Sequence, residues 1–369
     1  MKDLFLSLLR GCFFFPQRLF FWWKRSGIKR ASASKLVLAL GGVLQNRTFI
    51  HGGAVKLLAL RNTFPINEKK YNILYLVSSA QPPFAQDLVE KIRRRGIAFI
   101  WNQNGVGYPA WAGQETEWHN APMRRLRGMA DYVIYQSAFC RDSAEHFLGP
   151  CSAPSEVLLN PIDLDTFFPL PERPSFSPLR LLTLGTHGYA ERVFSTLHCL
   201  KNLSDAGCDT VLTIAGKCQW PQGLTSVQQE ISRLGLASRV TLLPAFSQKE
   251  AVALYQSHHI VLHPKYLDPC PTVVMEALAS GCPIVGSATG GVPELVCEGS
   301  GVLIPAPLDW NNMVTPTGAA LASGVLKILP HFEIYASAAR KRAEALFDQK
   351  RWVARHLEIF ESLHGCQRQ

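Results

Sequence analysis

Residues 260–296 read IVLHPKYLDPCPTVVMEALASGCPIVGSATGGVPELV, and this stretch decides the predicted fold. A short apolar run, typical of a buried strand, is followed by a loop that carries Asp268. A helix is predicted to start at Pro271, because a proline at the first helical position loses no hydrogen bond. The N–H groups of Thr272 and Val273 then point out of the helix start, which makes this turn a ready site for phosphate oxygens.

Two carboxylates flank this predicted anion site. Glu276 follows Asp268 by eight residues and lies just over one turn inside the helix. Carboxylates accept charge-assisted hydrogen bonds from vicinal hydroxyl groups, so the pair is suited to hold sugars on either side of a diphosphate. Two plainer interpretations stay open, namely that Asp268 only caps the helix and that Glu276 is a solvated helix position.

Outward from this stretch, short apolar runs alternate with helical patterns on both sides, which predicts a parallel α/β architecture. The expected strands are 35–42, 72–77, 98–102, 132–136, 156–159, 179–185, 210–215, 240–243, 260–263, 283–287 and 302–304. The expected helices are 55–60, 85–95, 137–147, 190–205, 224–234, 248–256, 272–279 and 339–363. No GxGxxG follows the first strand of either series, which disfavours a dinucleotide oxidoreductase.

A proline-dense segment, 161–178, separates the two series and is typical of a linker. We therefore expect two Rossmann-like domains that bind ligands in the cleft beyond the carboxyl ends of their strands. The predicted divisions are an N-terminal extension (1–34), a first Rossmann-like domain (35–170), a second Rossmann-like domain (171–338) and a C-terminal helical segment (339–369).

The net charge of +10 is unevenly distributed along the 369 residues. Residues 1–70 hold 13 Lys and Arg against 2 Asp and Glu, whereas the rest of the chain holds 25 against 26. A nearly neutral body argues against a nucleic-acid groove, because such grooves are lined with basic residues throughout. The ten cysteines form no CxxC pair, which predicts reduced thiols of a cytosolic protein rather than disulfides or a metal site.

The first thirty residues combine apolar and aromatic runs with a basic cluster that starts at Lys24. No clean apolar run of 18 residues occurs, so a spanning helix is not expected. Aromatic rings beside cations suit the headgroup region of a membrane, and we expect a peripheral location on the inner membrane face. A cleaved signal peptide and a helix that packs on a domain are the alternatives.

The D-x7-E spacing, together with Ala277–Pro283 and Gly290–Leu295, resembles the donor-binding segment of glycosyltransferase family 4, whose hallmark is E-x7-E. The resemblance implies a GT-B fold and a retaining, metal-independent transfer from a nucleotide diphosphate sugar, without any cofactor. It also implies that Glu276 binds the ribose and that Asp268 contacts the donor sugar or its phosphates. Aspartate is one methylene shorter than the family's glutamate, which changes its reach.

The diphosphate of the donor needs positive charge when no metal is present. Gly185 resembles the family's glycine at the end of a strand, but Thr186 stands where the family has an arginine. Arg192 is the candidate for the family's second cation, and Lys217 is either a further one or a surface lysine.

The N-terminal half resembles the family less closely. Gly52-Gly53 is similar to its glycine-rich loop, where the backbone approaches the phosphates or the acceptor. Asn104 stands where many members carry an acceptor-side histidine; it cannot act as a base but can hold a hydroxyl group. His119 is the fallback candidate for that role, although a histidine beside a tryptophan is more often structural.

The leading hypothesis is a retaining glycosyltransferase of envelope or exopolysaccharide assembly that acts on a glycan or lipid-linked acceptor. A nucleotide-sugar epimerase with the same fold and a non-catalytic nucleotide-sugar binder remain open, the latter because of Asp268, Asn104 and Thr186. A phosphorylase is less favoured, since no pyridoxal lysine can be identified. The donor sugar, its base and the linkage do not follow from the residues.

Overall fold

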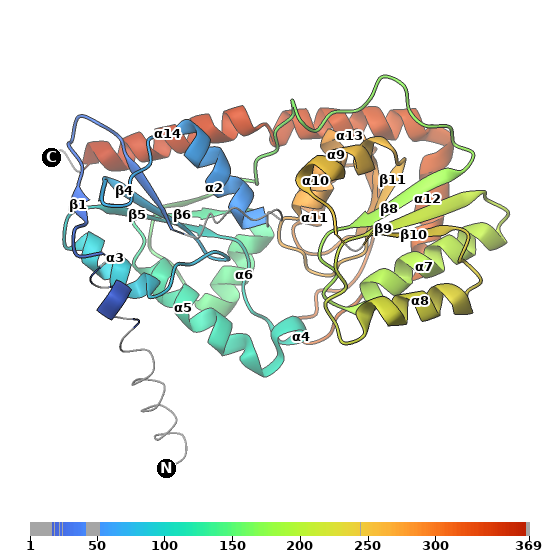
Figure 1. Cartoon of the computed structure of the whole chain (residues 1–369), viewed down its shortest axis with the longest axis horizontal. Coiled ribbons are helices and arrows are strands. Elements are labelled where there is room, and N and C mark those ends of the chain that lie inside the picture. The colour runs from blue at the N-terminus through green and yellow to red at the C-terminus, as the bar shows by residue number, and fades with distance from the viewer. Residues whose placement is uncertain are drawn as a thin grey trace, which may run out of the picture.

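The structure, a computed structural model, describes residues 17, 19–21, 23, 25–41, 52–243 and 245–366. Two α/β domains lie side by side, with the N-terminal domain on the left of Figure 1 and the C-terminal domain on the right. Each domain is built on a parallel sheet. The predicted fold class, two Rossmann-like domains, is confirmed.

The N-terminal domain contains a five-stranded parallel sheet in the order β2-β4-β5-β6-β7. The register runs, for example, from Ile73 opposite Ala98 to Val77 opposite Asn102. The strands are β2 (Leu38–Gly41), β4 (Ile73–Val77), β5 (Ala98–Gln103), β6 (Tyr132–Tyr135) and β7 (Ser155–Val157). The helices are α2 (Gly52–Thr63), α3 (Ala85–Arg93), α4 (Pro109–Ala112), α5 (Thr116–Gly128) and α6 (Ala138–Leu148).

The C-terminal domain contains a six-stranded parallel sheet in the order β10-β9-β8-β11-β12-β13. Its strands are β8 (Leu179–Leu184), β9 (Thr210–Ala215), β10 (Val240–Leu243), β11 (Ile260–His263), β12 (Ile284–Ser287) and β13 (Gly301–Ile304). Its helices are α7 (Ala190–Asp205), α8 (Gly223–Arg233), α9 (Gln248–Gln256), α10 (Thr272–Ala279), α11 (Val292–Leu295) and α12 (Gly318–Ile328).

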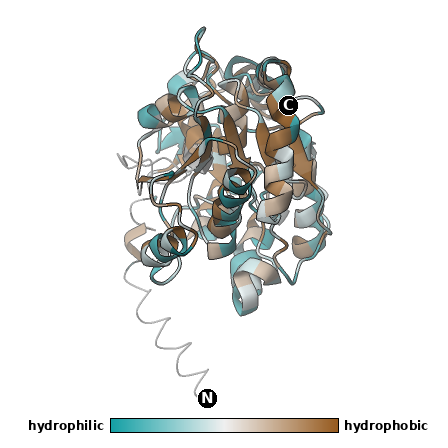
Figure 2. Cartoon of the chain, turned by 90° about the vertical axis from the view of Figure 1, so that its right-hand side faces the viewer, coloured by the Kyte–Doolittle hydropathy of each residue, from teal (hydrophilic) through white to brown (hydrophobic). Residues whose placement is uncertain are grey.

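Burial on both faces explains why the central strands read as continuous apolar runs. Every residue of β4 and of β11 is buried, as expected for parallel strands covered by helices on each side. Figure 2 shows the hydrophobic strands between helices whose outer faces are hydrophilic. The carboxyl ends of these strands are therefore the parts of the sheets that can meet a ligand.

The C-terminal segment, expected as one helix from residue 339, is two helices. α13 (Phe332–Leu346) packs against α10 of the C-terminal domain, whereas α14 (Gln349–Cys366) packs against α2 of the N-terminal domain. At the crossing, Ile162 N–H donates to Phe347 O (2.7 Å) and Gln349 N–H donates to Ile162 O (3.1 Å). The chain crosses between the domains twice, once after β7 and once between α13 and α14, and these two crossings are hydrogen-bonded to each other.

Several elements differ from the sequence-based expectations. α5 contains Pro122 and α12 begins at Gly318, so neither helix shows an uninterrupted helical pattern, and neither was predicted. A small parallel pair, β1 (Lys29–Arg30) with β3 (Lys70–Tyr71), joins the end of the predicted extension to the N-terminal domain. α10 has the expected range, Thr272–Ala279, but Pro271 is its N-cap and not its first helical residue.

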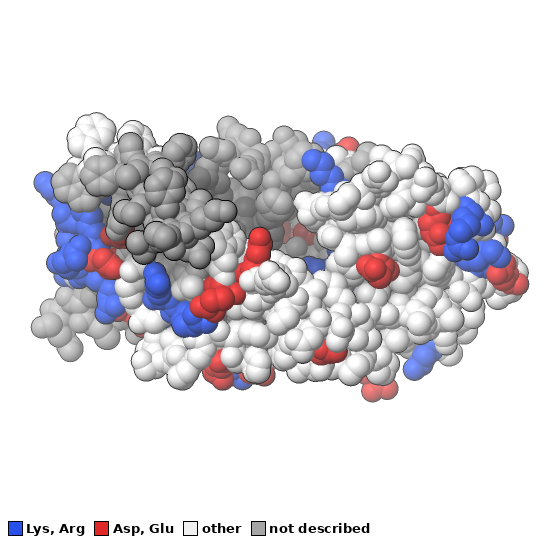
Figure 3. Space-filling model, turned by 90° about the horizontal axis from the view of Figure 1, so that it is seen from below, with Lys and Arg blue, Asp and Glu red and all other residues white. Residues whose placement is uncertain are grey.

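The membrane prediction for residues 1–30 falls mostly outside the described residues. Within the described part, Arg25 donates hydrogen bonds to Phe84 O (2.9 Å) and Pro83 O (2.7 Å), which places residue 25 against the N-terminal domain. No helix in the described ranges is long and apolar enough to cross a bilayer. In the view from below, Lys and Arg side chains gather at the N-terminal-domain end of the molecule (Figure 3).

Candidate donor site between the two domains

The start of α10 is the centre of the candidate site. Pro271, the N-cap, makes no side-chain capping hydrogen bond, and the first helical bonds run from Val274 N–H and Met275 N–H to Pro271 O. The N–H groups of Thr272 and Val273 precede these bonds, so they lie at the positive end of the helix dipole. The predicted anion site is therefore a helix N-terminus in the structure.

Asp268 is buried just before this helix start. Its carboxylate lies 2.8 Å from Lys265 Nζ and 3.4 Å from His263 Nε2. Burial alone would raise the pKa of Asp268, but the charge of Lys265 and the contact with His263 hold this pKa below its ordinary value. Burial lowers the pKa of His263 to about 4, so this imidazole is neutral at neutral pH.

Two glycines let another loop close behind Asp268. A Cβ on Gly290, which has a φ of 67°, would lie 2.4 Å from Asp268 O. A Cβ on Gly291 would lie 2.0 Å from Pro269 O. The Gly290-Gly291 pair of the sequence motif thus permits the backbone contact that supports the Asp268 loop.

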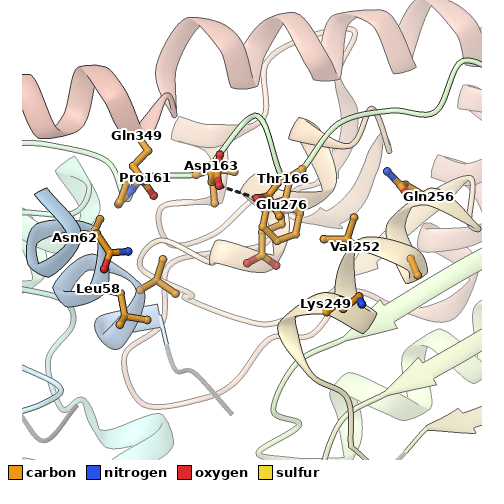
Figure 4. A pocket seen from close by; sticks show the side chains of 15 residues that line it. Leu58, Asn62, Pro161, Asp163, Thr166, Lys249, Val252, Gln256, Glu276 and Gln349 are labelled. Atoms are coloured by element: carbon orange, nitrogen blue, oxygen red, sulfur yellow. Dashed lines mark hydrogen bonds between the residues drawn. The ribbon is translucent and has the colours of Figure 1, made fainter. Parts of the chain in front are cut away.

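Glu276 lies on the other side of the helix start. Tyr255 OH, on α9, lies 2.9 Å from Glu276 Oε2. Burial raises the pKa of Glu276 to about 7. The side chain lines a cavity of about 610 Å³, called here the Glu276 cavity, between α2 of one domain and α9 and α10 of the other. Figure 4 shows Glu276 between Asn62 of α2 and Lys249 of α9.

A second cavity of about 810 Å³, called here the Lys265 cavity, lies on the Asp268 side. Its lining includes Ser78, Gly105 and Tyr108 from the N-terminal domain and Thr186, Tyr189 and Lys265 from the C-terminal domain. The 268–276 segment therefore runs from the wall of one interdomain cavity to the wall of the other. This arrangement suits a ligand with two polar ends joined by an anionic centre.

The loop after β8 has the glycine that the sequence predicted. Gly185 has a φ of 106°, a conformation that side chains rarely adopt, and it faces Val273 at the start of α10. Arg192, proposed as a phosphate ligand, is buried and donates to Leu184 O (2.9 Å) and Thr186 O (2.7 Å). It therefore holds the loop around Gly185. Lys217 is exposed and is not part of the lining of either cavity.

Asn104 takes part in a buried network that the sequence did not reveal. Its Oδ1 accepts a hydrogen bond from Lys56 Nζ (2.6 Å), and its Nδ2 donates to Ser79 Oγ. The same Lys56 ammonium donates to Asn102 Oδ1 (2.6 Å) and Gln136 Oε1 (3.3 Å). Lys56 is 1% exposed, and burial lowers its pKa to about 8. The only feature of the sequence that pointed to Lys56 was its position four residues after Gly52.

The remaining N-terminal candidates are only partly placed. Gly52 and Gly53 are the first residues of α2, and residues 42–51 lie outside the described part of the chain. His119 lines the Lys265 cavity between Trp111 and Trp118, whose ring centroids lie 4.9 Å and 4.8 Å away. The structure therefore places His119 at the cleft, as an aromatic neighbour.

Contacts between the domains hold the cleft in this form. Glu294 of α11 accepts hydrogen bonds from Ala138 N–H (2.7 Å) and Phe139 N–H (2.8 Å) at the start of α6. Ser137 Oγ donates to Pro269 O (2.6 Å), and Ala110 N–H donates to Trp310 O (2.8 Å). A carboxylate at a helix N-terminus is stabilised by the free N–H groups and the dipole. Sequence analysis assigned no role to Glu294.

No group of three His, Cys, Asp or Glu side chains suited to hold a metal occurs among the described residues. The eight cysteines whose surroundings the structure describes are all free thiols.

Comparison with known proteins gives a consistent result. Residues 177–322 match the family model described as "Glycosyl transferases group 1". The glycogen synthase of Mycobacterium tuberculosis is 27% identical over 266 residues, which cover 70% of this chain and 62% of that protein. The D-inositol 3-phosphate glycosyltransferase of Mycolicibacterium vanbaalenii is 36% identical over 109 residues, 29% of this chain and 24% of that protein. The chain thus matches less than two thirds of the length of either relative.

Among solved structures, Anabaena HepE in complex with UDP and glucose aligns with a TM-score of 0.70 at 16% identity, over 89% of this chain and 100% of that one. The paired parallel sheets and the interdomain site define this protein as a GT-B-fold protein. The C-terminal domain, through residues 177–322, is similar to the group 1 glycosyltransferases.

Proposed function

We propose that this protein transfers a sugar from a nucleoside diphosphate to a hydroxyl group of an acceptor, with retention of the anomeric configuration and without a metal ion. In the transfer, the bond from the anomeric carbon to the diphosphate oxygen breaks and its electron pair stays with the diphosphate. A new bond forms to the acceptor oxygen on the same face, and the acceptor proton passes to the departing phosphate.

The observation that carries this proposal is the place of the α10 start. It lies between two interdomain cavities, with Glu276 lining one and Asp268 beside the wall of the other. In the proposed complex, Glu276 binds the ribose hydroxyls, Thr272 and Val273 N–H bind the diphosphate, and Asp268 faces the sugar. The UDP and glucose in the HepE structure support a nucleotide sugar as the class of donor.

Buried polar atoms without partners support a binding site at this place. Arg192 Nε and His187 Nδ1 have no hydrogen-bond partner within the described part of the chain. Such atoms are costly to bury, and they are tolerated where binding or catalysis uses them.

A thermal-shift panel of nucleotide sugars tests the donor assignment. A ligand at a hundred times its Kd stabilises the folded state by about 2.7 kcal/mol. For Glu276→Ala, a hundredfold loss of affinity leaves about 0.4 kcal/mol at the same concentration. The matched control is Glu344→Ala, because Glu344 is an exposed carboxylate of α13 paired with Arg340. Equal shifts in wild type and Glu276→Ala would refute the assignment.

Transfer itself separates this proposal from its alternatives. Incubation with donor alone yields an altered donor sugar from an epimerase, and neither turnover nor product from a non-catalytic binder. NMR assignment of the product anomer tests retention.

We further propose that the protein acts in envelope or exopolysaccharide assembly, at the inner face of the membrane, through residues 1–30. The aromatic and basic composition of that segment supports this location. A chain without residues 1–30 is expected to lose most of its binding to anionic vesicles. Equal partition of both chains would refute the proposed location.

A further inference from the structure

Of the positions where the family resemblance implied cations for the donor diphosphate, one is uncharged, one is hydrogen-bonded to backbone carbonyls and one lies outside both cavities. Thr186 is uncharged, and the guanidinium of Arg192 is tied to Leu184 O and Thr186 O. Lys217 is exposed outside both cavities. The charge must therefore come from elsewhere if no metal takes part.

Lys265 is the only lysine or arginine among the described residues that line the Lys265 cavity. Its side chain is 37% exposed, so it remains accessible from the cavity. Tyr189 OH accepts a hydrogen bond from Tyr266 N–H (2.9 Å), which joins the Thr186–Tyr189 loop to the residue next to Lys265. Lys265 therefore lies where the loop after Gly185 and the approach to α10 come together.

The carboxylate of Asp268 positions this lysine. The Lys265–Asp268 contact is 2.8 Å, and the Asp268 side chain is 11% exposed, so the carboxylate is the more buried partner of the pair. An ammonium group has three N–H donors, and one contact with Asp268 leaves two for a ligand. Burial of Asp268 also makes its interaction with Lys265 stronger than that of a surface pair.

We propose that Lys265 binds the diphosphate of the donor and stabilises the negative charge that the diphosphate gains as the sugar leaves, an inference that rests on the proposed sugar transfer. Lys265 donates hydrogen bonds to the phosphate oxygens and keeps its proton throughout. Asp268 is then a positioning residue for Lys265 as well as a contact for the sugar.

The structure offers a matched control in Lys201. This lysine of α7 also pairs with an aspartate of the same domain, Asp205, and its side chain is 39% exposed. It is not part of the lining of either cavity. Methionine is used at both positions because it keeps the apolar stem and removes the charge.

Calorimetric titration with UDP, GDP and ADP, and with uridine, guanosine and adenosine, tests the proposal on the full chain. For the diphosphate that wild type binds, Lys265→Met is expected to lower affinity at least about tenfold, the loss of one charge-assisted hydrogen bond. Binding of the corresponding nucleoside is expected to change less than about twofold, Lys265→Arg to recover most of the loss, and Lys201→Met to bind as wild type.

Three outcomes would contradict either the Lys265 inference or the proposed function. If wild type binds a nucleoside diphosphate and Lys265→Met binds it equally well, the Lys265 inference fails while the proposed function stands. If Lys265→Met weakens nucleoside and diphosphate binding alike, the lysine acts on local structure and the inference also fails. If wild type binds no nucleoside diphosphate, the proposed function itself fails.

Discussion

The two sides of the cleft differ in how their buried polar side chains are hydrogen-bonded. On the N-terminal side, the amides at the ends of β5 and β6 converge on Lys56, whose ammonium donates to three amide oxygens. On the C-terminal side, Arg192 Nε and His187 Nδ1 have no partner in the described part of the chain, and Asn160 Oδ1, where the N-terminal network reaches the C-terminal domain, has none either. A satisfied network rigidifies a domain, whereas unsatisfied groups are retained where a ligand uses them.

The N-terminal network extends beyond Lys56. Asn102 Nδ2 donates to Tyr75 OH (2.9 Å), and that hydroxyl lies 3.1 Å from His356 Nε2 of α14. Asn160 Nδ2 donates to Gln136 Oε1 (3.1 Å) and to Cys270 O (3.1 Å), just before α10. The network thus links α14, the first sheet and the segment before α10.

The largest effect on stability is expected from Lys56→Ala. It leaves the amide oxygens of Asn102 and Asn104 without the Lys56 donor, while Gln136 Oε1 keeps its hydrogen bond from Asn160. We expect a loss of about 2–4 kcal/mol in the free energy of unfolding. Urea denaturation measures this loss, with Lys201→Ala as a surface control that changes stability by less than about 0.5 kcal/mol. If Lys56→Ala also changed the free energy of unfolding by less than about 0.5 kcal/mol, the proposed difference between the two sides of the cleft would be contradicted.

On the C-terminal side, the pH dependence of donor binding is a more direct test than a change in stability. The pKa of Glu276 is about 7 because burial disfavours its charged form, so the carboxyl group is protonated below that pH. Only the ionised form accepts hydrogen bonds from both ribose hydroxyls. Affinity for a nucleotide sugar is therefore expected to fall about tenfold from about pH 8 to about pH 6.

Calorimetric titration of UDP-glucose across this range checks that expectation, since its diphosphate keeps its charge there. Glu276→Gln cannot ionise, and its weaker affinity should stay flat. An equally steep fall in this variant would assign the pH dependence to another group.

A smaller effect is expected at the contact that joins the two sides. Glu294→Ala removes the carboxylate from the start of α6, which we expect to cost about 1 kcal/mol of stability. Small-angle scattering should show a larger radius of gyration as the domains separate. The control is Glu298→Ala, at an exposed carboxylate three residues beyond α11, which should change neither the stability nor the radius of gyration. A similar response in both variants would argue against the idea that Glu294 holds the two domains together.

No effect is expected from a chelator. Because helix N–H groups and lysine are proposed to neutralise the diphosphate, EDTA should leave the transfer rate within error of the untreated enzyme. Loss of activity that Mg²⁺ or Mn²⁺ restores would show that a metal ion supplies this charge.

The sequence by itself determined the fold class and the centre of the site. Buried parallel strands appear in the sequence as apolar runs whatever their neighbours are. The D-x7-E segment at a helix start spans only nine consecutive residues, so its geometry follows from their order along the chain. The helices α5 and α12 escaped prediction because an internal proline and repeated glycines obscure their patterns.

Only the tertiary structure decided which charged groups face the cleft. The sequence analysis named Arg192 as the candidate cation and gave Lys265 no role. Folding ties Arg192 to backbone carbonyls and leaves Lys265 at a cavity wall. Lys56 meets Asn102 and Gln136 across 46 and 80 residues of chain, and Glu294 meets Ala138 across 156. Such partners are brought together by sheet order and domain docking, which the spacing of residues along the chain does not encode.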